Sequence, residues 1–133
     1  MGKFFMQDLK NAVKMHRMAE KDFKALINMT DETLFDIEIF GFHAQQTVEK
    51  LLKAWLSAIG IKYERTHDLQ VLVLLLKDNR QQLPDELVDL ENLTDFAVNF
   101  RYDVFEIVDA PIERQEIIDK IQKLKALVFG FLS

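Results

Sequence analysis

The chain has 133 residues, of which 49% are hydrophobic and 29% charged, a composition that fits one globular domain spanning residues 1–133. It has no cysteine, which excludes disulfides and thiolate metal sites, and no apolar run of the ~20 residues that a membrane span requires. A net charge of −5 argues against a general nucleic-acid binder, and the apolar run in the first ten residues is too short for a signal peptide, so we expect a soluble, cytoplasmic protein.

The first predicted helix covers about residues 7–28. One stripe with spacings of three and four runs along it, formed by Leu9, Ala12, His16, Ala19, Phe23 and Leu26. We interpret His16 as a core histidine with a satisfied hydrogen bond rather than as a ligand.

The second predicted helix, about residues 32–59, is the longest. Its stripe is typical of the seam of an antiparallel bundle and consists of Leu34, Ile37, Gly41, Ala44, Val48, Leu51, Trp55 and Ala58. Further apolar residues on both sides of the stripe widen this face. The pattern therefore predicts a helix that is central in the bundle or that packs in an oligomer.

Three shorter helices are predicted after residue 60. The third begins near Thr66 as its N-cap and turns inward Leu69, Leu72, Val73 and Leu76. The fourth begins at Pro84, and its inward stripe is Leu87, Leu90, Thr94, Ala97 and Arg101. The last follows Pro111 and ends near Gly130. Because the connections are short, consecutive helices should run antiparallel, and the fold class is all-α, an up-and-down antiparallel bundle of four to five helices.

Polar residues gather on one flank of the second helix. His43 and Lys50 lie two turns apart on the same face, and Gln46 and Lys53 form a neighbouring line. Two interpretations remain open for this flank. It is either a solvated surface on which Glu49 pairs with Lys53, or one side of an anion-binding site.

The loop that follows, Ile61 to Asp68, brings Arg65, Thr66 and His67 to the start of a helix. Free backbone N–H groups at a helix start favour an anion, so phosphate would fit there. An N-cap with exposed charges explains the same residues equally well.

Arg101 continues the inward stripe of the fourth predicted helix. Burying a guanidinium without a partner is costly, so a carboxylate, a backbone carbonyl or a bound anion should meet it. Alternatively, the helix frays at Asn99 and Arg101 points into water or pairs with an acidic residue.

Other chemistries have little support in the sequence. The three histidines lack metal-ligand spacing, the four glycines are isolated, and neither serine has the context of a catalytic nucleophile. We therefore assign no catalytic residue, no metal and no cofactor.

Three segments together resemble the HEPN domains, named after higher eukaryotes and prokaryotes and nucleotide binding. They are FHAQQTVEKLLKAWL at Phe42 to Leu56, GIKYERTHDL at Gly60 to Leu69, and the Phe100 to Tyr102 element. The resemblance covers most of residues 7–128. It implies a bundle of four or five helices that is commonly a homodimer, and that often accompanies a minimal nucleotidyltransferase in a toxin–antitoxin operon.

Many HEPN proteins are metal-independent ribonucleases in which a histidine follows an arginine after four to six residues. Here no histidine follows His67, so the chain resembles the non-catalytic branch of the family. For that branch the resemblance implies a site for a nucleotide or another phosphate ligand, with Tyr102 placed to stack on a base. The ligand-binding residues implied are His43, Lys50, Lys53, Arg65, His67, Arg101 and Tyr102.

Three hypotheses about function follow. The leading one is a non-enzymatic HEPN module that binds a nucleotide or a nucleotidyltransferase partner. The second is a ribonuclease toxin with a degenerate active site, acting on RNA, in which His43 or His67 replaces the missing histidine. The third is a structural module whose broad apolar second helix serves dimerisation alone.

Overall fold

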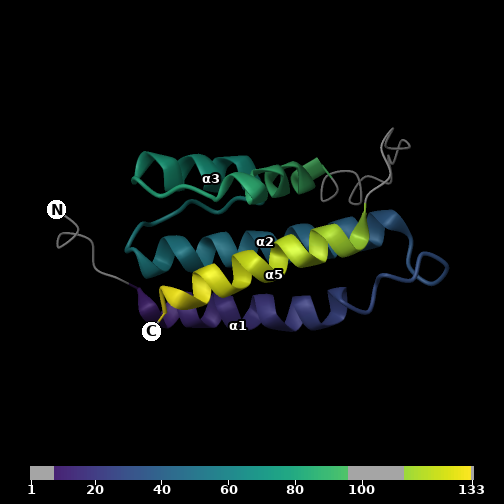
Figure 1. Cartoon of the computed structure of the whole chain (residues 1–133). Coiled ribbons are helices and arrows are strands. Elements are labelled where there is room, and N and C mark those ends of the chain that lie inside the picture. The colour runs from purple at the N-terminus through teal and green to yellow at the C-terminus, as the bar shows by residue number, and fades with distance from the viewer. Residues whose placement is uncertain (1–7, 96–112, 133) are drawn as a thin grey trace.

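The structure, a computed structural model, describes residues 8–95 and 113–132. These residues form a bundle without strands, composed of α1 (Leu9–Leu26), α2 (Ile37–Ala58), α3 (Leu69–Asp78), the 3₁₀ helix η2 (Asp85–Leu93) and α5 (Arg114–Gly130) (Figure 1). The predicted all-α bundle is confirmed. Arg101 and Tyr102 lie outside the described residues. In the part of the chain that is described, none of the helices combines the length and the apolar character needed to cross a membrane.

Helix α2 is the centre of the bundle, as its wide apolar face predicts. It contacts each of the other four described helices, and every residue from Leu51 to Ala58 is buried. A helix that is surrounded on all sides buries most of its circumference. The prediction that Leu34 belongs to this buried seam is wrong, because α2 begins at Ile37 and Leu34 is 74% exposed. The chain is still turning before α2, since Leu34 and Phe35 both donate their backbone N–H to the Asp31 carbonyl.

Helix α1 packs on α2 through the predicted stripe, from Ala12 to Leu26, whereas Leu9 at its start is 42% exposed. His16 is 3% exposed, and both ring nitrogens have partners. Nδ1 lies 2.9 Å from a carboxylate oxygen of Glu20, and Nε2 lies 3.3 Å from the carbonyl oxygen of Lys125 on α5. The interpretation of His16 as a satisfied core histidine is therefore confirmed.

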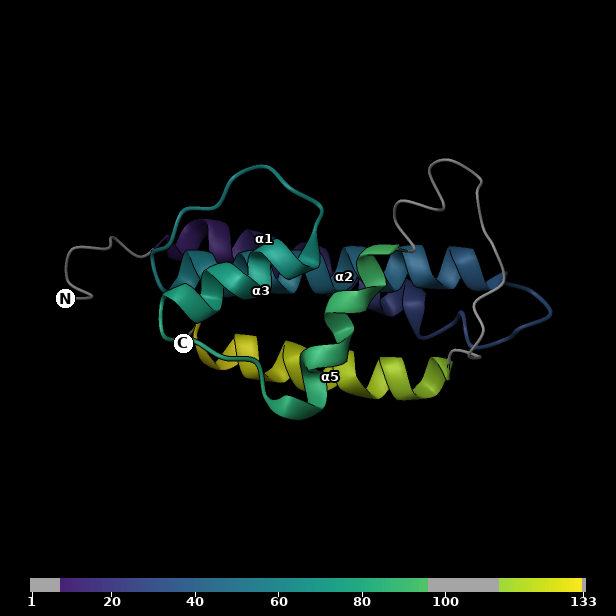
Figure 2. The same ribbon diagram turned by 90° about the horizontal axis from the view of Figure 1, so that it is seen from above.

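The direction of α3 differs from the prediction. Helices α1 and α2 are antiparallel, as the Asp22–Lys50 ion pair in their middle and the Asp8–Ser57 backbone hydrogen bond at one end indicate. Helices α2 and α3, however, run in the same direction (Figure 2). The carbonyl of His67, just before α3, accepts a hydrogen bond from Gln45 at 2.8 Å, and Gln81, just after α3, accepts one from Trp55.

The loop 59–68 makes this parallel arrangement possible. It leaves the end of α2, returns along the bundle and delivers its last residues beside the first half of α2 (Figure 2). Moving back from Ala58 to Glu49 along a helix requires about 14 Å. Ten extended residues reach up to ~33 Å, so the loop is long enough for a crossing that a shorter connection would forbid.

The start of α3 is capped by Asp68, so the prediction of Thr66 as the N-cap is wrong. The Asp68 carboxylate accepts the backbone N–H of Gln70 at 2.9 Å, while the Thr66 hydroxyl accepts the N–H of Asp68 at 3.1 Å. Thr66 therefore orders the last residues of the loop and does not cap the helix itself.

The segment predicted as the fourth α-helix begins as the 3₁₀ helix η2. Its buried residues, Leu87, Leu90 and Leu93, are three positions apart, and three residues per turn place them on one line. The predicted stripe passed through Thr94 instead. The buried line therefore reaches Leu93 where the prediction placed Thr94. The inward position predicted for Arg101 was counted from Thr94, so the helix as observed up to Leu93 does not support it.

The buried arginine of the described residues is Arg114, at the start of α5, which is 7% exposed. It donates to the carbonyl of Met29 at 2.8 Å and lies over the Phe40 ring, whereas its Nε has no hydrogen-bond partner. The Thr33 hydroxyl and backbone N–H lower the pKa of the nearby Asp31 carboxyl, and the charge of Arg114 adds to this effect. Arg114 thus joins α5 to the connection between α1 and α2.

Gly60 ends α2 and starts the crossing loop. Its φ is 80°, its N–H donates to the Ser57 carbonyl, and the N–H of Ile61 donates to the Leu56 carbonyl. This double hydrogen bond is the Schellman arrangement, which requires a left-handed residue.

We predict that Gly60→Ala lowers the free energy of unfolding by about 1 kcal/mol, because a Cβ disfavours positive φ. Urea denaturation of the full chain measures the change. Gly130→Ala is the matched control, because an added Cβ there meets no atom within 4 Å. An equal loss of stability in both variants would contradict this explanation.

Candidate functional site

A buried carboxylate on α2 organises the polar residues between α2 and the crossing loop. Glu49 is 4% exposed and accepts three hydrogen bonds. Gln45 Nε2 and His67 Nδ1 lie 3.1 and 3.0 Å from Oε1, and Lys53 Nζ lies 3.0 Å from Oε2. Positions 45, 49 and 53 are four residues apart, so one face of α2 supplies three members and the loop supplies the fourth. We call Gln45, Glu49, Lys53 and His67 the Glu49 cluster.

The cluster balances its own buried charge. An isolated buried carboxylate would be strongly unfavourable, and Lys53, itself 8% exposed, provides the neutralising ammonium. The predicted Glu49–Lys53 pair therefore exists, but it is buried and not part of a solvated surface.

His67 is the member of the cluster that reaches solvent. Its side chain is 55% exposed, although Nδ1 is held against Glu49. A carboxylate accepts and does not donate, so Nδ1 carries a proton toward Glu49. In the neutral ring Nε2 is then an acceptor, and in the protonated ring it is a donor. The described residues offer Nε2 no hydrogen-bond partner. The geometry therefore presents one oriented nitrogen to solvent.

A second polar group anchors the middle of the loop to α1. The Tyr63 hydroxyl accepts a hydrogen bond from Asn11 at 3.1 Å, and Asn11 also donates to the Ser57 hydroxyl at 2.8 Å. The Lys53 ammonium lies 5.6 Å from the centre of the Tyr63 ring, a cation–π contact. Anchors at Tyr63 and at His67 hold the loop in place at two points along its length.

The predicted ligand-binding residues lie at different places in the structure and have different partners. Lys53 and His67 meet through Glu49. Lys50 is instead ion-paired with Asp22 of α1. Arg65 is exposed, with no ion pair to any described residue, and Arg101 and Tyr102 are outside the described ranges.

His43 does not join the Glu49 cluster. It is half-buried, its ring packs edge-on against Phe42 at 5.5 Å, and its carbonyl accepts the Thr47 hydroxyl.

The first two backbone N–H groups of α3 are paired within the protein. The N–H of Leu69 donates to the Thr94 hydroxyl at 2.9 Å, and that of Gln70 donates to Asp68. These two amides are therefore not available to a phosphate, and side chains of the loop are the donors that the site offers.

Glu49 and Gln45 were missed as site residues. Each follows an apolar residue on α2, and the sequence pattern predicts both as surface residues. No feature of the sequence indicates that a loop covers them. A Gln and a Glu one turn apart, next to the buried Ala44 and Val48, were the available signal.

Over residues 8–95 and 113–132, no three His, Asp or Glu side chains are grouped so that they could hold a metal ion. The arrangement can do two things chemically. The exposed nitrogen of His67 can bind an anion when the ring is protonated, and it can exchange a proton with a bound molecule.

We predict that Glu49→Gln lowers the free energy of unfolding by about 3 kcal/mol, because Lys53 is then buried without a counter-ion. Adding Lys53→Met removes the orphaned charge and should restore more than half of the loss. Urea denaturation measures both, and Glu64→Gln in the exposed part of the loop is the control. A double variant no more stable than Glu49→Gln alone would show that the charge pair is not what Glu49 contributes.

In a comparison with protein families, residues 12–129 match the HEPN domain. No curated protein and no solved structure matches the chain. The matched range contains the whole Glu49 cluster.

Proposed function

This chain belongs to the HEPN domain family, and from that premise we propose that it is a non-catalytic module that binds the phosphate group of a nucleotide at loop 59–68. The observation that carries the proposal is the exposed ring of His67, oriented by the buried carboxylate of Glu49.

The local charge balance supports an anionic ligand. Lys53 neutralises Glu49, and Asp22 neutralises Lys50, so neither lysine adds free positive charge. When His67 is protonated, it and Arg65, which forms no ion pair with any described residue, carry positive charge in the same loop. A guanidinium binds phosphate oxygens in pairs, and an imidazolium adds a single directed hydrogen bond.

Orientation of the ligand groups before binding also supports the proposal. A ring held through Nδ1 loses little rotational freedom when a ligand arrives, which reduces the cost of binding. The anchors at Tyr63 and at the His67 carbonyl restrain the backbone of the same loop. We propose in addition that Arg101 and Tyr102, which lie outside the described residues, take part in binding, Arg101 through the phosphate and Tyr102 by stacking on the base.

Family membership supports the remaining parts of the proposal. We propose that a minimal nucleotidyltransferase is the partner protein, in a toxin–antitoxin type of system, and that the module is a homodimer in the cytoplasm. Co-purification with the product of a neighbouring gene and light scattering of the purified chain test these two points.

We expect titration calorimetry with ATP, GTP and short RNAs to give measurable heat with at least one of them. His67→Gln should weaken that binding about tenfold, because a charge-assisted hydrogen bond is lost, while the fold keeps most of its stability because the glutamine amide can still donate to Glu49. Lys62→Gln is the control for loss of one loop cation. Arg101→Ala and Tyr102→Ala report whether these residues share the ligand. Absence of heat with every ligand, or equal affinity in His67→Gln, would remove the proposal.

A second candidate function is supported by the same pair. A histidine held by a buried carboxylate is the arrangement of a general acid–base, and in this candidate function we propose that His67 replaces the missing histidine of a metal-independent ribonuclease.

For this candidate we expect cleavage of a short RNA in the presence of EDTA, with a rate that falls at least about a hundredfold in His67→Gln. Gel analysis of labelled RNA measures the rate, and growth of cells that overproduce the protein is an independent readout. Intact RNA and normal growth would reject this candidate and leave ligand binding unaffected.

A further inference from the structure

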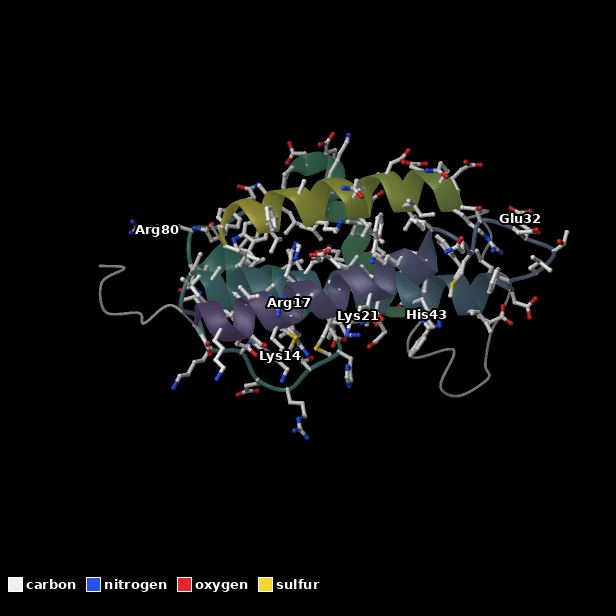
Figure 3. The ribbon with its side chains drawn as sticks, turned by 90° about the horizontal axis from the view of Figure 1, so that it is seen from below. Lys14, Arg17, Lys21, Glu32, His43 and Arg80 are labelled. Carbon is white, nitrogen blue, oxygen red and sulfur yellow. The ribbon has the colours of Figure 1, made fainter. Side chains whose placement is uncertain are left out.

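The outer side of α1 carries a row of cations that the proposed nucleotide site does not use. All are exposed, and none forms an ion pair with any described residue; they are Lys10, Lys14, Arg17, Lys21 and Lys24. Their positions lie on the side of α1 opposite to its buried stripe, over about 21 Å of helix. Figure 3 shows Lys14, Arg17 and Lys21 following one another along this side. A chain with a net charge of −5 thus concentrates unpaired positive charge on one helix face.

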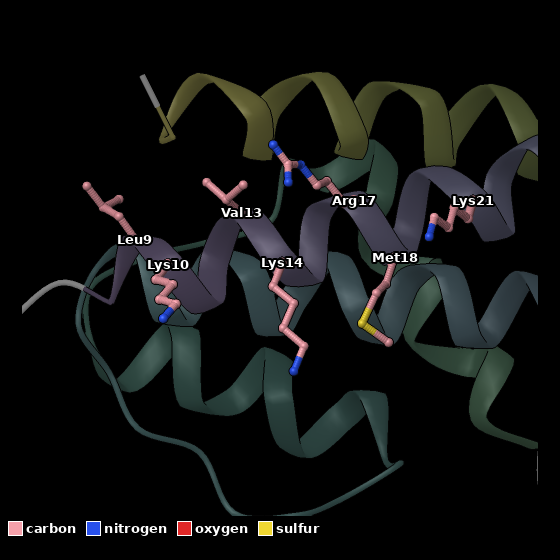
Figure 4. A pocket seen from close by; sticks show the side chains of 7 residues that line it. All are labelled: Leu9, Lys10, Val13, Lys14, Arg17, Met18 and Lys21. Carbon is pink, nitrogen blue, oxygen red and sulfur yellow. The ribbon is translucent and has the colours of Figure 1, made fainter.

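Apolar side chains are interleaved with these cations. A hollow of about 730 Å³ on this face is lined by the first four cations of the row together with Leu9, Val13 and Met18. Leu9 is 42% and Met18 37% exposed, so both offer apolar surface to a partner. In Figure 4 Lys14 and Met18 point to one side of the helix and Val13 to the other. We call this hollow and the cations around it the α1 face.

The combination of charge and apolar surface discriminates among polyanions. A single-stranded nucleic acid is bound by cations together with aromatic platforms for its bases, and no aromatic residue lines the hollow. A membrane surface requires a broad apolar face with residues such as Trp and Phe, but the broad apolar face of α1 is buried against α2.

A second copy of the chain also fits poorly. Two exposed segments of the described residues are acidic. On η2, Asp89 and Glu86 are already paired with Lys120 and Lys123 of α5, and the connection from Asp31 to Asp36 is not a helix that could lie along α1. Contact between two different faces of identical chains is also a head-to-tail contact, which builds rings or open filaments and not the two-fold homodimer proposed for this chain.

We propose that the α1 face is a docking surface for an acidic, amphipathic helix of a partner protein. Leu, Ile or Met side chains spaced by three and four residues would enter the hollow, and flanking Asp and Glu would meet the lysines and Arg17. Complementary charge would steer the encounter, and the apolar contacts would hold the complex. The α1 face shares no residue with the proposed nucleotide site at loop 59–68, so either proposal can be refuted without affecting the other.

The test uses the full chain and a fluorescein-labelled, capped helical peptide of roughly 18 residues, with leucine at spacings of three and four and glutamate elsewhere. Fluorescence anisotropy at about 50 mM salt measures the affinity. We expect binding to the wild type, a loss of about tenfold in Lys14→Gln/Arg17→Gln/Lys21→Gln, and a smaller loss in Met18→Gln.

The matched control removes three exposed cations elsewhere, as Lys77→Gln/Arg80→Asn/Lys123→Gln, with asparagine chosen because residue 80 has positive φ. It has the same net charge as the α1 variant and should bind the peptide like the wild type. The proposal is overturned if the peptide does not bind, or if both triple variants bind equally. Tighter, α1-dependent binding of an oligouridine strand or of phosphatidylserine vesicles would also overturn it. Nucleotide binding by calorimetry should be unchanged in the α1 variant.

Discussion

The buried carboxylate of Glu49 is the interaction on which the arrangement of this protein depends. A charge in the central helix is tolerated only if donors surround it, and the helix itself supplies two, from Gln45 and Lys53. The third donor is His67, which the crossing loop delivers. The path of loop 59–68, the parallel direction of α3 and the exposure of one histidine nitrogen are therefore linked to a single side chain.

Ion pairs within the fold also determine which cations are available to bind a ligand. The sequence predicts Lys50 and Lys53 as anion ligands. In the fold, however, Lys50 pairs with Asp22 of α1, and Lys53 pairs with Glu49 of α2. Binding an anion there would require breaking a partly or fully buried pair. Positive charge is available in loop 59–68 at Arg65 and at a protonated His67, so the part of the proposed ligand that binds there is a single anionic group such as one phosphate.

Helix α1 shows how one helix serves two purposes through its two faces. Its inner stripe packs against α2 and places His16 against the α5 backbone, so this face holds three helices together. Its outer face has no described helix against it and carries the unpaired cations. Substitutions on the outer face can therefore change binding without changing the core, which is what makes the α1 face separable from the Glu49 cluster.

Local periodicity by itself determined the helical class, the stripe of α1, the wide apolar face of α2 and the pairing of Glu49 with Lys53, because contacts between residues three or four apart follow from helix geometry. The tertiary structure decided which of these contacts are buried and which loop residue joins them. His67 lies 18 positions from Glu49, and Lys50 lies 28 from Asp22, so these pairs depend on how separate helices pack. Packing of leucines favours the 3₁₀ form of η2, and pairing of the buried Glu49 charge favours the return of the loop along α2. In both cases tertiary contacts outweigh the weak local preferences of a short segment.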